Sequence, residues 1–461
     1  MKQKYLSLTP GNRKLILIFS GWAHDDAFFG GLFYPECDIM VVWDYRDFNF
    51  DSTSLAGYDM VYLFAWSFGV YAASCVLPKL DKHNIAFSIA VNGSLYPVDD
   101  ERGIPSGVFA GTRDSLNEAN LTKFYRRIIS DRKRFTELSC QFAEKDTTSL
   151  REELVAIDTM AHKDGELYTG WDRVIISDND KIFPLDNLKR SWESHPRLKI
   201  VSGEHLPDWK TVIDSEVIDS RLVGRSFSKS VATYEANATV QQHMAKKLWN
   251  LWNEAIGSDI PESICEIGYG TGLLTRLYTT RFSAAILTLI DAVPFTTDVC
   301  QACNIITGDA EKYLQLFPPQ SFDTVVSAAT VQWFNSLPMF IRHALRTLKP
   351  GGLLLFSTFG KDNLKELASV TGHSLRYYSI REICAMVPEE EGQVVVAEEE
   401  RITLEFPSPK EAMEHLHRTG VNGMRGNPVG LRRIYTDYPL DKSGMAPLTY
   451  HPIYIIIQKE S

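Results

Sequence analysis

A serine stands at a sharp turn between an apolar run and a stretch of small residues. Ser67 follows the apolar residues 62–66, and Gly69 lies two places after it, as in the G-x-S-x-G pattern of a nucleophile elbow. Such a turn exposes the serine hydroxyl and needs small neighbours, because the strand and helix backbones converge there. Ala65 departs from the pattern by one methyl group. The spacing therefore predicts a nucleophilic serine.

Two partners for this serine follow in the chain order typical of α/β-hydrolases, serine, then acid, then histidine. Asp180 lies in a loop after a later strand, and His205 lies in the loop after the next one. In this interpretation His205 takes the proton of Ser67, and Asp180 fixes the tautomer of the histidine. Asp178 is the alternative acid, but Asp180 directly precedes an apolar Lys-Ile-Phe-Pro segment and is preferred. Taken singly, the three residues could equally be a helix-start serine, a cap and a loop histidine.

The same site needs two backbone N–H groups to hold the oxyanion of a tetrahedral intermediate. Phe68, directly after the nucleophile, is predicted to supply one of them. The segment Gly21-Trp22 follows the first buried strand and is predicted to supply the other, through Trp22. A reaction of the acyl-transfer class, such as ester hydrolysis, fits this set.

A second group of residues, near the middle of the chain, combines glycines with acids at successive strand ends. Glycines allow a backbone to turn tightly and to pass close to a ligand. The sequence is E-x-G-x-G-x-G, and a carboxylate at that place suits the ammonium group of S-adenosylmethionine better than a pyrophosphate. The predicted cofactor residues are Glu266, Gly268, Gly270, Gly272, Asp291, Asp309 and Ala310.

The later acids of this group have separate predicted roles. Asp291 ends the next strand about 20 residues on, where an acid can accept both ribose hydroxyls. Asp309, beside Ala310, is positioned for the adenine amino group. The alternative is an NAD-binding domain of the Rossmann type, which the same strand and glycine pattern also permits.

The elements that must position these residues indicate α/β architecture in both halves. We predict an N-terminal α/β-hydrolase domain, residues 1–215, and a C-terminal Rossmann-like class I methyltransferase domain, residues 216–461. Residues 212–222 are predicted to be helical, and residues 224–226 are predicted to be a linker. The predicted strands are 15–19, 39–43, 60–64, 87–91, 173–176 and 198–201 in the first half, and 263–267, 285–290, 324–328 and 352–358 in the second.

A helical insertion is predicted between residues 112 and 169, where the strand pattern stops. This predicted lid carries a run of basic residues beside aromatic ones. A charge run is usually a solvated helix face, but in an acidic protein it is also a landing site for an acidic partner. The basic residues are Lys123, Arg126, Arg127, Arg132, Lys133 and Arg134.

Composition excludes several classes of function. The net charge of the 461 residues is −10, which argues against general binding of nucleic acid. The longest apolar run near the start, residues 15–19, is far shorter than the ~20 residues that span a membrane. We expect a cytoplasmic protein with reduced cysteines. No second CxxC or paired histidine follows Cys300 and Cys303 at zinc spacing, and His415 and His417 have no carboxylate pattern around them. No metal is therefore predicted.

The second half resembles the malonyl-carrier-protein O-methyltransferases of the biotin pathway. Residues 232–241 (ATYEANATVQ) and 327–333 (SAATVQW) carry the resemblance, which runs from about residue 223 to the end. The resemblance implies S-adenosylmethionine as methyl donor. It also implies substrate-binding roles for Tyr234, Gln241, Gln332 and Trp333, with Gln332 and Trp333 facing the transferred methyl group. Tyr269 departs from the family's glycine loop, where a small or polar residue is common.

The first half resembles the short hydrolases that cleave the methyl ester of pimeloyl-carrier protein. Residues 19–22, 66–69, 103–105 and 204–205 carry this resemblance, which covers about the first 210 residues. Its motifs are less distinctive than those of the second half. Together the two resemblances imply a bifunctional enzyme of biotin synthesis that acts on thioesters of an acyl-carrier protein.

The carrier protein of such systems is acidic, so the resemblance also implies docking at the basic lid residues, Arg126 and Arg127 among them. Two other functions stay open from the sequence. One is a small-molecule methyltransferase with an inactive hydrolase-like binding module. The other is a scaffold that binds S-adenosylmethionine without transferring methyl.

Overall fold

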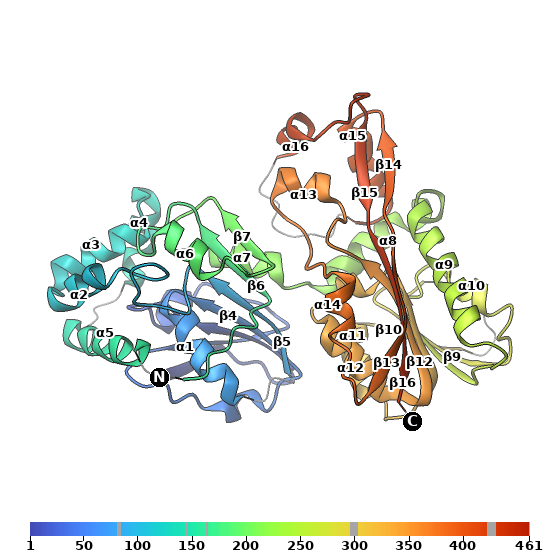
Figure 1. Ribbon diagram of the computed structural model, residues 1–461, viewed down its shortest axis with the longest axis horizontal. Coiled ribbons are helices and arrows are strands. Elements are labelled where there is room, and N and C mark those ends of the chain that lie inside the picture. The colour runs from blue at the N-terminus through green and yellow to red at the C-terminus, as the bar shows by residue number, and fades with distance from the viewer. Residues whose placement is uncertain (81–83, 143–145, 163–164, 296–302, 422–429, 461) are drawn as a thin grey trace. The chain divides into compact units, whose positions relative to one another are not determined.

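The computed structural model describes residues 1–80, 84–142, 146–162, 165–295, 303–421 and 430–460. By its internal contacts the chain divides into two compact units, Met1–Val212 and Ile213–Ser461. Each unit contains one seven-stranded sheet with helices (Figure 1). The sequence-based boundary, after residue 215, falls close to this division. The two units are described separately.

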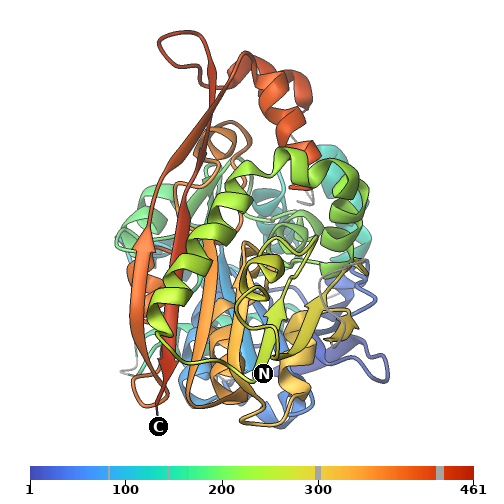
Figure 2. The ribbon, with the colours of Figure 1, turned by 90° about the vertical axis from the view of Figure 1, so that its right-hand side faces the viewer.

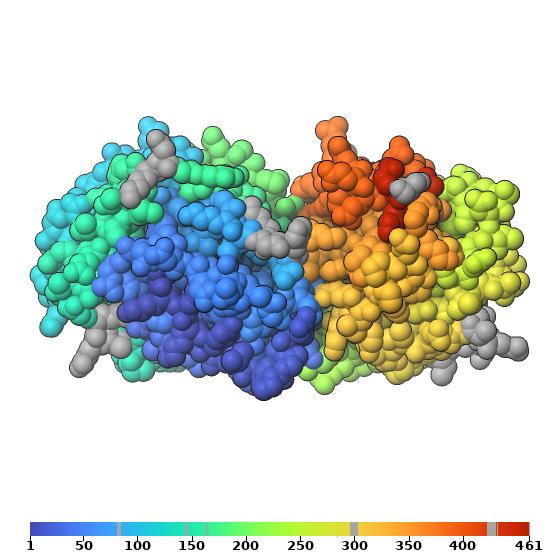
Figure 3. Space-filling view, turned by 90° about the horizontal axis from the view of Figure 1, so that it is seen from below, coloured from blue at the N-terminus to red at the C-terminus, as the bar shows by residue number. Residues whose placement is uncertain are grey.

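The first unit is built on a sheet of order β1-β3-β2-β4-β5-β6-β7. Strand β1 pairs antiparallel with β3, and all other pairs are parallel. As the edge strand, β1 alternates between exposed and half-buried residues and lies near the surface of the unit (Figure 3, dark blue). The strands are β1 Lys2–Ser7, β2 Lys14–Phe19, β3 Asp38–Trp43, β4 Met60–Trp66, β5 Ile85–Val91, β6 Arg173–Ser177 and β7 Leu198–Val201.

The central strands of this sheet are apolar along their whole length rather than at alternate positions. Every residue of β4 is buried, and so is every residue of β2 after Lys14. A parallel sheet with both faces covered requires such runs. Helices α2 to α5 form an insertion between β5 and β6, where a helical lid was predicted (Figure 1). The helices are α1 Phe68–Val76, α2 Ser106–Asp114, α3 Glu118–Ile128, α4 Arg132–Leu138, α5 Thr147–Ala161, α6 Leu185–Ser191 and α7 Trp209–Glu216.

The second unit is built on a sheet of order β10-β9-β8-β11-β12-β16-β13. The last strand, β16, runs antiparallel between β12 and β13, and the remaining pairs are parallel. The chain turns to opposite sides of β8, so the carboxyl end of β8 is a topological switch point, where such sheets bind ligands. The strands are β8 Ser263–Ile267, β9 Ile286–Asp291, β10 Cys303–Thr307, β11 Phe322–Ala328, β12 Leu348–Phe359, β13 Gly392–Glu399 and β16 Pro452–Lys459.

Alternate side chains of these strands enter two different cores. Ile264 packs in a cluster with α9 and α10 on one face, whereas its neighbour Cys265 packs with α11 and α12 on the other. Figure 2 shows α9 running across its face of the sheet. A smaller sheet pairs β14, Ile402–Phe406, with β15, Ala446–Tyr450. The helices are α8 Ser220–Asn237, α9 Thr239–Ala255, α10 Thr275–Tyr278, α11 Ala310–Leu316, α12 Leu337–Thr347, α13 Lys365–Thr371, α14 Ile380–Cys384, α15 Pro409–Arg418 and α16 Leu431–Asp437.

The prediction of a linker at residues 224–226 is wrong, because these residues lie inside α8. Gly224 is buried in this helix, and a Cβ atom there would meet the Cβ of Ala292 at 3.4 Å. At this position α8 packs against the loop after β9. The predicted helix over 212–222 is also interrupted, since α7 ends at Glu216 and α8 begins at Ser220.

Candidate functional sites

The turn between β4 and α1 places Ser67 in a backbone conformation that few side-chain-bearing residues adopt. Its φ is 57° and its ψ is −126°. Gly69 is required by contact, because a Cβ atom there would lie 2.3 Å from the carbonyl oxygen of Phe19. Ala65, the departure from the glycine pattern, is fully buried in β4. The geometry is that of a nucleophile elbow.

The structure brings Ser67, His205 and Asp180 into one chain of hydrogen bonds. Nε2 of His205 lies 3.1 Å from Oγ of Ser67, and Nδ1 of His205 lies 2.7 Å from Oδ2 of Asp180. The other oxygen of Asp180 accepts the backbone N–H groups of Ile182 and Phe183 at 2.7 and 3.0 Å. His205 and the Asp180 side chain are almost fully buried. This is the relation of nucleophile, base and orienting acid that acyl transfer requires.

Asp178, the other candidate acid, has a different place. It is exposed, and its Oδ1 accepts the backbone N–H of Gly203 at 3.0 Å. This bond ties the loop after β6 to the loop that carries the histidine. Of the two acids, only Asp180 contacts the imidazole of His205.

Several contacts missed by the sequence analysis hold the histidine loop in place. The carbonyl of His205 accepts the indole N–H of Trp66 at 2.9 Å and the amide of Asn92 at 2.8 Å. The guanidinium of Arg134 donates to the carbonyls of Leu206 and Pro207 at 3.1 and 2.8 Å. These acceptors are all main-chain carbonyls, which every residue carries, so no sequence pattern could have identified the pairs.

The two predicted oxyanion donors lie in suitable elements. Phe68 is the first residue of α1, and the first N–H groups of a helix have no partner within it. Gly21 lies against the elbow, since a Cβ atom there would be 3.1 Å from the Cβ of Ser67. Trp22 follows directly and is anchored by its indole, which donates to the carbonyl of Leu150 at 3.1 Å.

The basic residues of the lid fall into two groups. Arg126 and Arg127 are exposed on α3, and the Arg126 guanidinium lies over the Phe135 ring, 4.6 Å from its centroid. Lys123, Arg132 and Lys133 are also exposed. Arg134, by contrast, is half-buried and bound to the histidine loop as described above. It is therefore not part of an open basic surface.

In the second unit, the glycine loop after β8 has the predicted conformation. Gly268, Gly270 and Gly272 all have positive φ, at 69°, 53° and 83°. At Gly268 there is also no room, because a Cβ atom would lie 2.1 Å from Oγ1 of Thr330. The glycine loop thus packs closely against the residues that follow β11.

The three predicted acids lie at the carboxyl ends of β8, β9 and β10: Glu266 is the penultimate residue of β8, Asp291 is the last residue of β9, and Asp309 comes two residues after β10. Glu266 is buried, and one of its oxygens accepts the hydroxyls of Thr275 and Tyr278, both at 2.7 Å. Burial raises the pKa of Glu266 to about 7. Asp291 accepts the N–H groups of Gly270 and Val293, each at 2.9 Å, and burial raises its pKa to about 6. A bound cation would stabilise the ionised forms of these two buried carboxyl groups.

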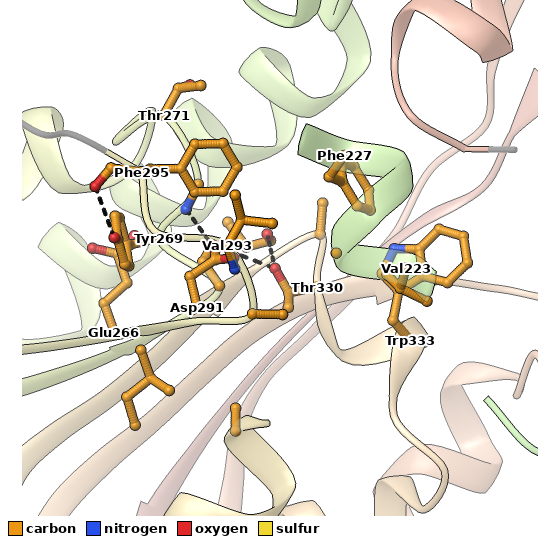
Figure 4. A pocket seen from close by; sticks show the side chains of 18 of the residues that line it. Val223, Phe227, Glu266, Tyr269, Thr271, Asp291, Val293, Phe295, Thr330 and Trp333 are labelled. Atoms are coloured by element: carbon orange, nitrogen blue, oxygen red, sulfur yellow. Dashed lines mark hydrogen bonds between the residues drawn. The ribbon is translucent and has the colours of Figure 1, made fainter. Parts of the chain in front are cut away.

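A cavity of about 1100 Å³, including its open mouth, lies above these acids. Figure 4 shows Glu266 and Asp291 on one side of it, with Val223, Phe227 and Trp333 on the other. The predicted residues that line it are Tyr234, Gln241, Glu266, Gly268, Gly270, Asp291, Asp309, Ala310 and Trp333.

Two predicted residues do not line this cavity. Gly272 lies just beyond it and donates its N–H to the carbonyl of Tyr269 at 2.8 Å. Gln332 lines a smaller neighbouring cavity of about 380 Å³, and its amide donates to the carbonyl of Ala329 at 2.6 Å. Phe334 borders both cavities.

One wall of the large cavity was missed by the sequence analysis, namely the inner face of α8. Val223, Phe227 and Val231, none of which was predicted, line the cavity from this helix beside the predicted Tyr234. Their spacing of three to four residues is the apolar stripe of an amphipathic helix, which the sequence does contain. Because residues 224–226 were predicted to be a linker, this stripe was not recognised as one helix face.

The residues present fit S-adenosylmethionine. Its ammonium and sulfonium groups would place positive charge beside Glu266 and Asp291, whose ionised forms are otherwise disfavoured by burial. Asp309 caps α11, with its Oδ1 accepting the N–H of Glu311 at 3.0 Å, and lines the same cavity. A pyrophosphate would meet several acids here and no basic side chain among the described lining residues.

Neither a metal site nor a membrane span is found in the described part of the chain. No group of three or more ligating side chains gathers there, and no helix is both long and apolar enough to cross a bilayer. His415 instead pairs with the hydroxyl of Tyr450 at 3.0 Å. The six described cysteines are free, and Cys300 lies outside the described residues.

Fold and site together define an α/β-hydrolase-like domain with a serine–histidine–aspartate site, followed by a class I methyltransferase domain. The family model "Pimeloyl-ACP methyl esterase BioG" matches residues 1–211, and the model "Methyltransferase domain" matches residues 265–356. A malonyl-[acyl-carrier protein] O-methyltransferase of Bacteroides fragilis is 33% identical over 464 residues, which cover 98% of this chain and 94% of that protein. The chain belongs to the malonyl-[acyl-carrier protein] O-methyltransferase family.

Other relatives match one half only. The malonyl-[acyl-carrier protein] O-methyltransferase of Haemophilus influenzae is 31% identical over 249 residues, covering 52% of this chain and 94% of that protein. The crystal structure of BioG from the same species is 32% identical, covers 44% of this chain and 94% of that one, and has a TM-score of 0.40.

Proposed function

We propose that this chain carries out two reactions on acyl-carrier-protein thioesters in biotin synthesis. The C-terminal unit methylates the free carboxylate of a malonyl thioester, using S-adenosylmethionine. The N-terminal unit hydrolyses the methyl ester of a pimeloyl thioester to the acid and methanol. The hydrogen-bonded chain of Ser67, His205 and Asp180, within a polypeptide that also has the acid-lined cavity, carries this proposal.

The two reactions make chemical sense together. A free carboxylate is costly to bury in the apolar site of a chain-extending enzyme, and methylation removes its charge. Once the acyl chain has been extended, hydrolysis of the methyl ester restores the acid. One polypeptide would therefore begin and end the period in which the carboxylate is masked.

In the proposed hydrolysis, Ser67 attacks the ester carbonyl while His205 takes its proton at Nε2. The N–H groups of Phe68 and Trp22 hold the oxyanion, and Asp180 stabilises the imidazolium. When the tetrahedral intermediate collapses, His205 returns the proton to the departing methoxide, which leaves as methanol. A water molecule, deprotonated by His205, then attacks the acyl-serine and releases the acid and the serine hydroxyl.

In the proposed methyl transfer, the protein mainly binds and aligns. Bound in the cavity, S-adenosylmethionine supplies an electrophilic methyl group. Glu266 would hold its ammonium group, Asp291 its ribose hydroxyls and Asp309 its adenine amino group. The accepting carboxylate is already ionised at neutral pH, because such acids titrate near pH ~4. No general base is needed. Tyr234, Gln241 and Trp333, which line the cavity, would orient the acceptor.

Mass spectrometry of two carrier-protein thioesters tests this function. Incubation of malonyl-carrier protein with the enzyme and S-adenosylmethionine should add one methyl group, and methyl-pimeloyl-carrier protein should lose one. The variant Ser67→Ala should retain the first reaction and lose the second. Absence of hydrolysis in both the unaltered protein and Ser67→Ala would favour the hydrolase-like domain as a binding module.

The proposed esterase must discriminate between the two esters. If it cleaved malonyl methyl ester as fast as pimeloyl methyl ester, the protein would consume S-adenosylmethionine in a futile cycle. We therefore expect a strong preference for the long acyl chain. Comparable kcat/KM values for the two methyl esters in the intact protein would contradict this selectivity.

The exposed lid residues are the proposed carrier-protein contact of the esterase. This set comprises Lys123, Arg126, Arg127, Arg132 and Lys133, without the half-buried Arg134. Joint charge reversal of Arg126, Arg127 and Arg132 should raise KM for the carrier-bound ester but leave hydrolysis of a small methyl ester unchanged. An unchanged KM would remove this surface from the proposal.

A further inference from the structure

The outer face of α8 carries a stripe of positive charge in a protein whose net charge is −10. Arg221, Arg225 and Lys229 follow one another at intervals of four residues, and all three are exposed. Residues four apart on a helix lie on the same side, one turn above the other. We refer to these three residues as the α8 basic stripe.

The opposite face of the same helix lines the methyltransferase cavity. Val223, Gly224, Phe227 and Val231 all contribute to the lining. Since each residue advances the helix by about 100°, the centre of the α8 basic stripe lies about 145° from the centre of this lining face. Figure 4 shows Val223 and Phe227 pointing from α8 toward Trp333. The basic stripe therefore stands about one helix diameter, ~10 Å, from the cavity.

Two of the three charges of the stripe are not paired within the described residues. Arg221 pairs with Asp219 at 3.3 Å, but Arg225 and Lys229 form no ion pair with any described residue. The only acid of α8, Glu235, lies on another side and pairs with Arg276 at 2.8 Å. On the neighbouring helix α9, by contrast, Lys247 is matched by Glu398 and Glu400.

We propose that the α8 basic stripe is the surface on which the methyltransferase unit docks its acidic carrier protein. The proposal rests on the proposed function, because it takes the carrier protein as the bearer of the methyl acceptor. A partner with acidic side chains fits three basic groups in a row by charge complementarity. Its acyl arm then needs to reach past only one helix to enter the cavity. This surface is separate from the lid residues proposed for the esterase.

The test compares a macromolecular and a small acceptor on the full chain. The double variant Arg225→Glu/Lys229→Glu should raise KM for malonyl-carrier protein about tenfold or more at low salt. Its kcat, its affinity for S-adenosylmethionine and its turnover of a small malonyl thioester, malonyl-N-acetylcysteamine, should not change. Rim charges act mainly on association, so the effect should shrink as salt is raised.

A matched control separates docking from net charge. Lys246 and Lys442 are exposed, and neither forms an ion pair with a described residue, so Lys246→Glu/Lys442→Glu changes the charge by the same amount elsewhere. This control should leave KM for the carrier protein within about twofold. An unchanged KM in the α8 variant, or an equal rise in the control, would overturn the proposal. An equal loss of activity toward the small thioester would also overturn it, since the helix itself would then be damaged.

Direct binding keeps this proposal distinguishable from the proposed function. Binding of unacylated carrier protein, followed by fluorescence anisotropy, requires no catalysis. If the unaltered protein binds the carrier but does not methylate malonyl-carrier protein, the proposed methyl transfer fails and the docking surface stands. If it methylates malonyl-carrier protein and demethylates methyl-pimeloyl-carrier protein while the α8 variant binds the carrier as tightly as the unaltered protein, the docking surface fails and the proposed function stands.

Discussion

The two candidate sites are organised in opposite ways. In the first unit, the reacting groups satisfy one another, because Asp180 binds His205 and His205 binds Ser67 within the protein. In the second unit, buried acids face a cavity and have pKa values raised by burial. A site that performs nucleophilic chemistry must be complete before substrate arrives. A site that binds a cation instead leaves negative groups uncompensated until the ligand supplies the charge.

The largest expected effect is the loss of ester hydrolysis when the nucleophile of the first site is removed. Ser67→Ala removes the nucleophile and should lower kcat for methyl-ester hydrolysis by about 10⁴- to 10⁶-fold. Methyl transfer should stay within about twofold of the unaltered rate, because the site of transfer is built from the other sheet. Parallel assays of both activities on one preparation provide the measurement. A comparable loss of both activities would mean that the two sites depend on one another.

A pair of matched variants sharpens the assignment within the first site. Asp180→Asn disturbs the acceptor of the His205 Nδ1–H and should lower kcat by about 10⁴-fold through the wrong tautomer. Asp178→Asn keeps an oxygen that can accept the Gly203 N–H, so its loss should stay within about tenfold. Steady-state hydrolysis of a small methyl ester distinguishes them. Equal losses would show that the histidine loop, rather than the triad acid, limits the rate.

In the second site the informative change is in pH dependence. The pKa of Glu266 is raised to about 7 in the ligand-free protein, so below that pH a proton competes with the ligand's ammonium group. The affinity for S-adenosylmethionine should therefore fall by up to tenfold per pH unit as pH drops from about 7 toward 5.5. Glu266→Gln should bind more weakly at pH 8 and lose most of this pH dependence. Calorimetric titration across that range measures both.

The same pKa shift has a consequence for stability with the opposite sign. A carboxyl whose pKa is raised in the folded state keeps its proton there when the unfolded chain has lost it, at pH values between about 4.5 and 7. The Glu266 contribution to the stability of the ligand-free protein therefore declines as pH rises through that window. The increase in Tm on adding S-adenosylmethionine should be larger at pH 8 than at pH 6, and nearly equal at both in Glu266→Gln.

The strands that carry the sites could be predicted because their signals are local. The central parallel strands are continuous apolar runs, and the elbow and the glycine loop follow directly after two of them. The prediction omitted β1, β10 and all four strands after β12, namely β13 to β16, and placed no strand in antiparallel pairing. Strand β16 lies near the end of the chain and enters the sheet between β12 and β13. No local sequence pattern predicts that it pairs with these two strands. Long-range pairing is set by the fold as a whole.

The misread segment at residues 224–226 shows a second limit. A glycine inside a helix costs roughly 1 kcal/mol relative to alanine, so Gly224 is more typical of a break than of a helix interior. The structure nevertheless continues α8 through Gly224 and packs this turn against Ala292, a contact that the sequence does not reveal. As a result, the helix that forms one wall of the cavity was divided between a linker and a family motif.

Arg134 is where sequence and structure disagree most within the first site, and it gives the smallest predicted effect. The sequence grouped it with Arg132 as a docking residue, but its guanidinium donates to the carbonyls of Leu206 and Pro207, next to the catalytic histidine. We expect Arg134→Ala to lower kcat on a small methyl ester about tenfold, with little change in KM, because a positioning bond is lost. Arg132 is exposed, so Arg132→Ala should leave that kcat unchanged.

The split between kcat and KM decides which role Arg134 has. A docking residue would affect KM for the carrier-bound ester and leave a small ester untouched, since only the carrier protein offers it a partner surface. A residue that orients the histidine loop changes kcat for both esters. Restoration of kcat by Arg134→Lys, which can donate to at least one of the two carbonyls, would support the positioning role. An effect of Arg134→Ala confined to the carrier-bound ester would return Arg134 to the docking surface.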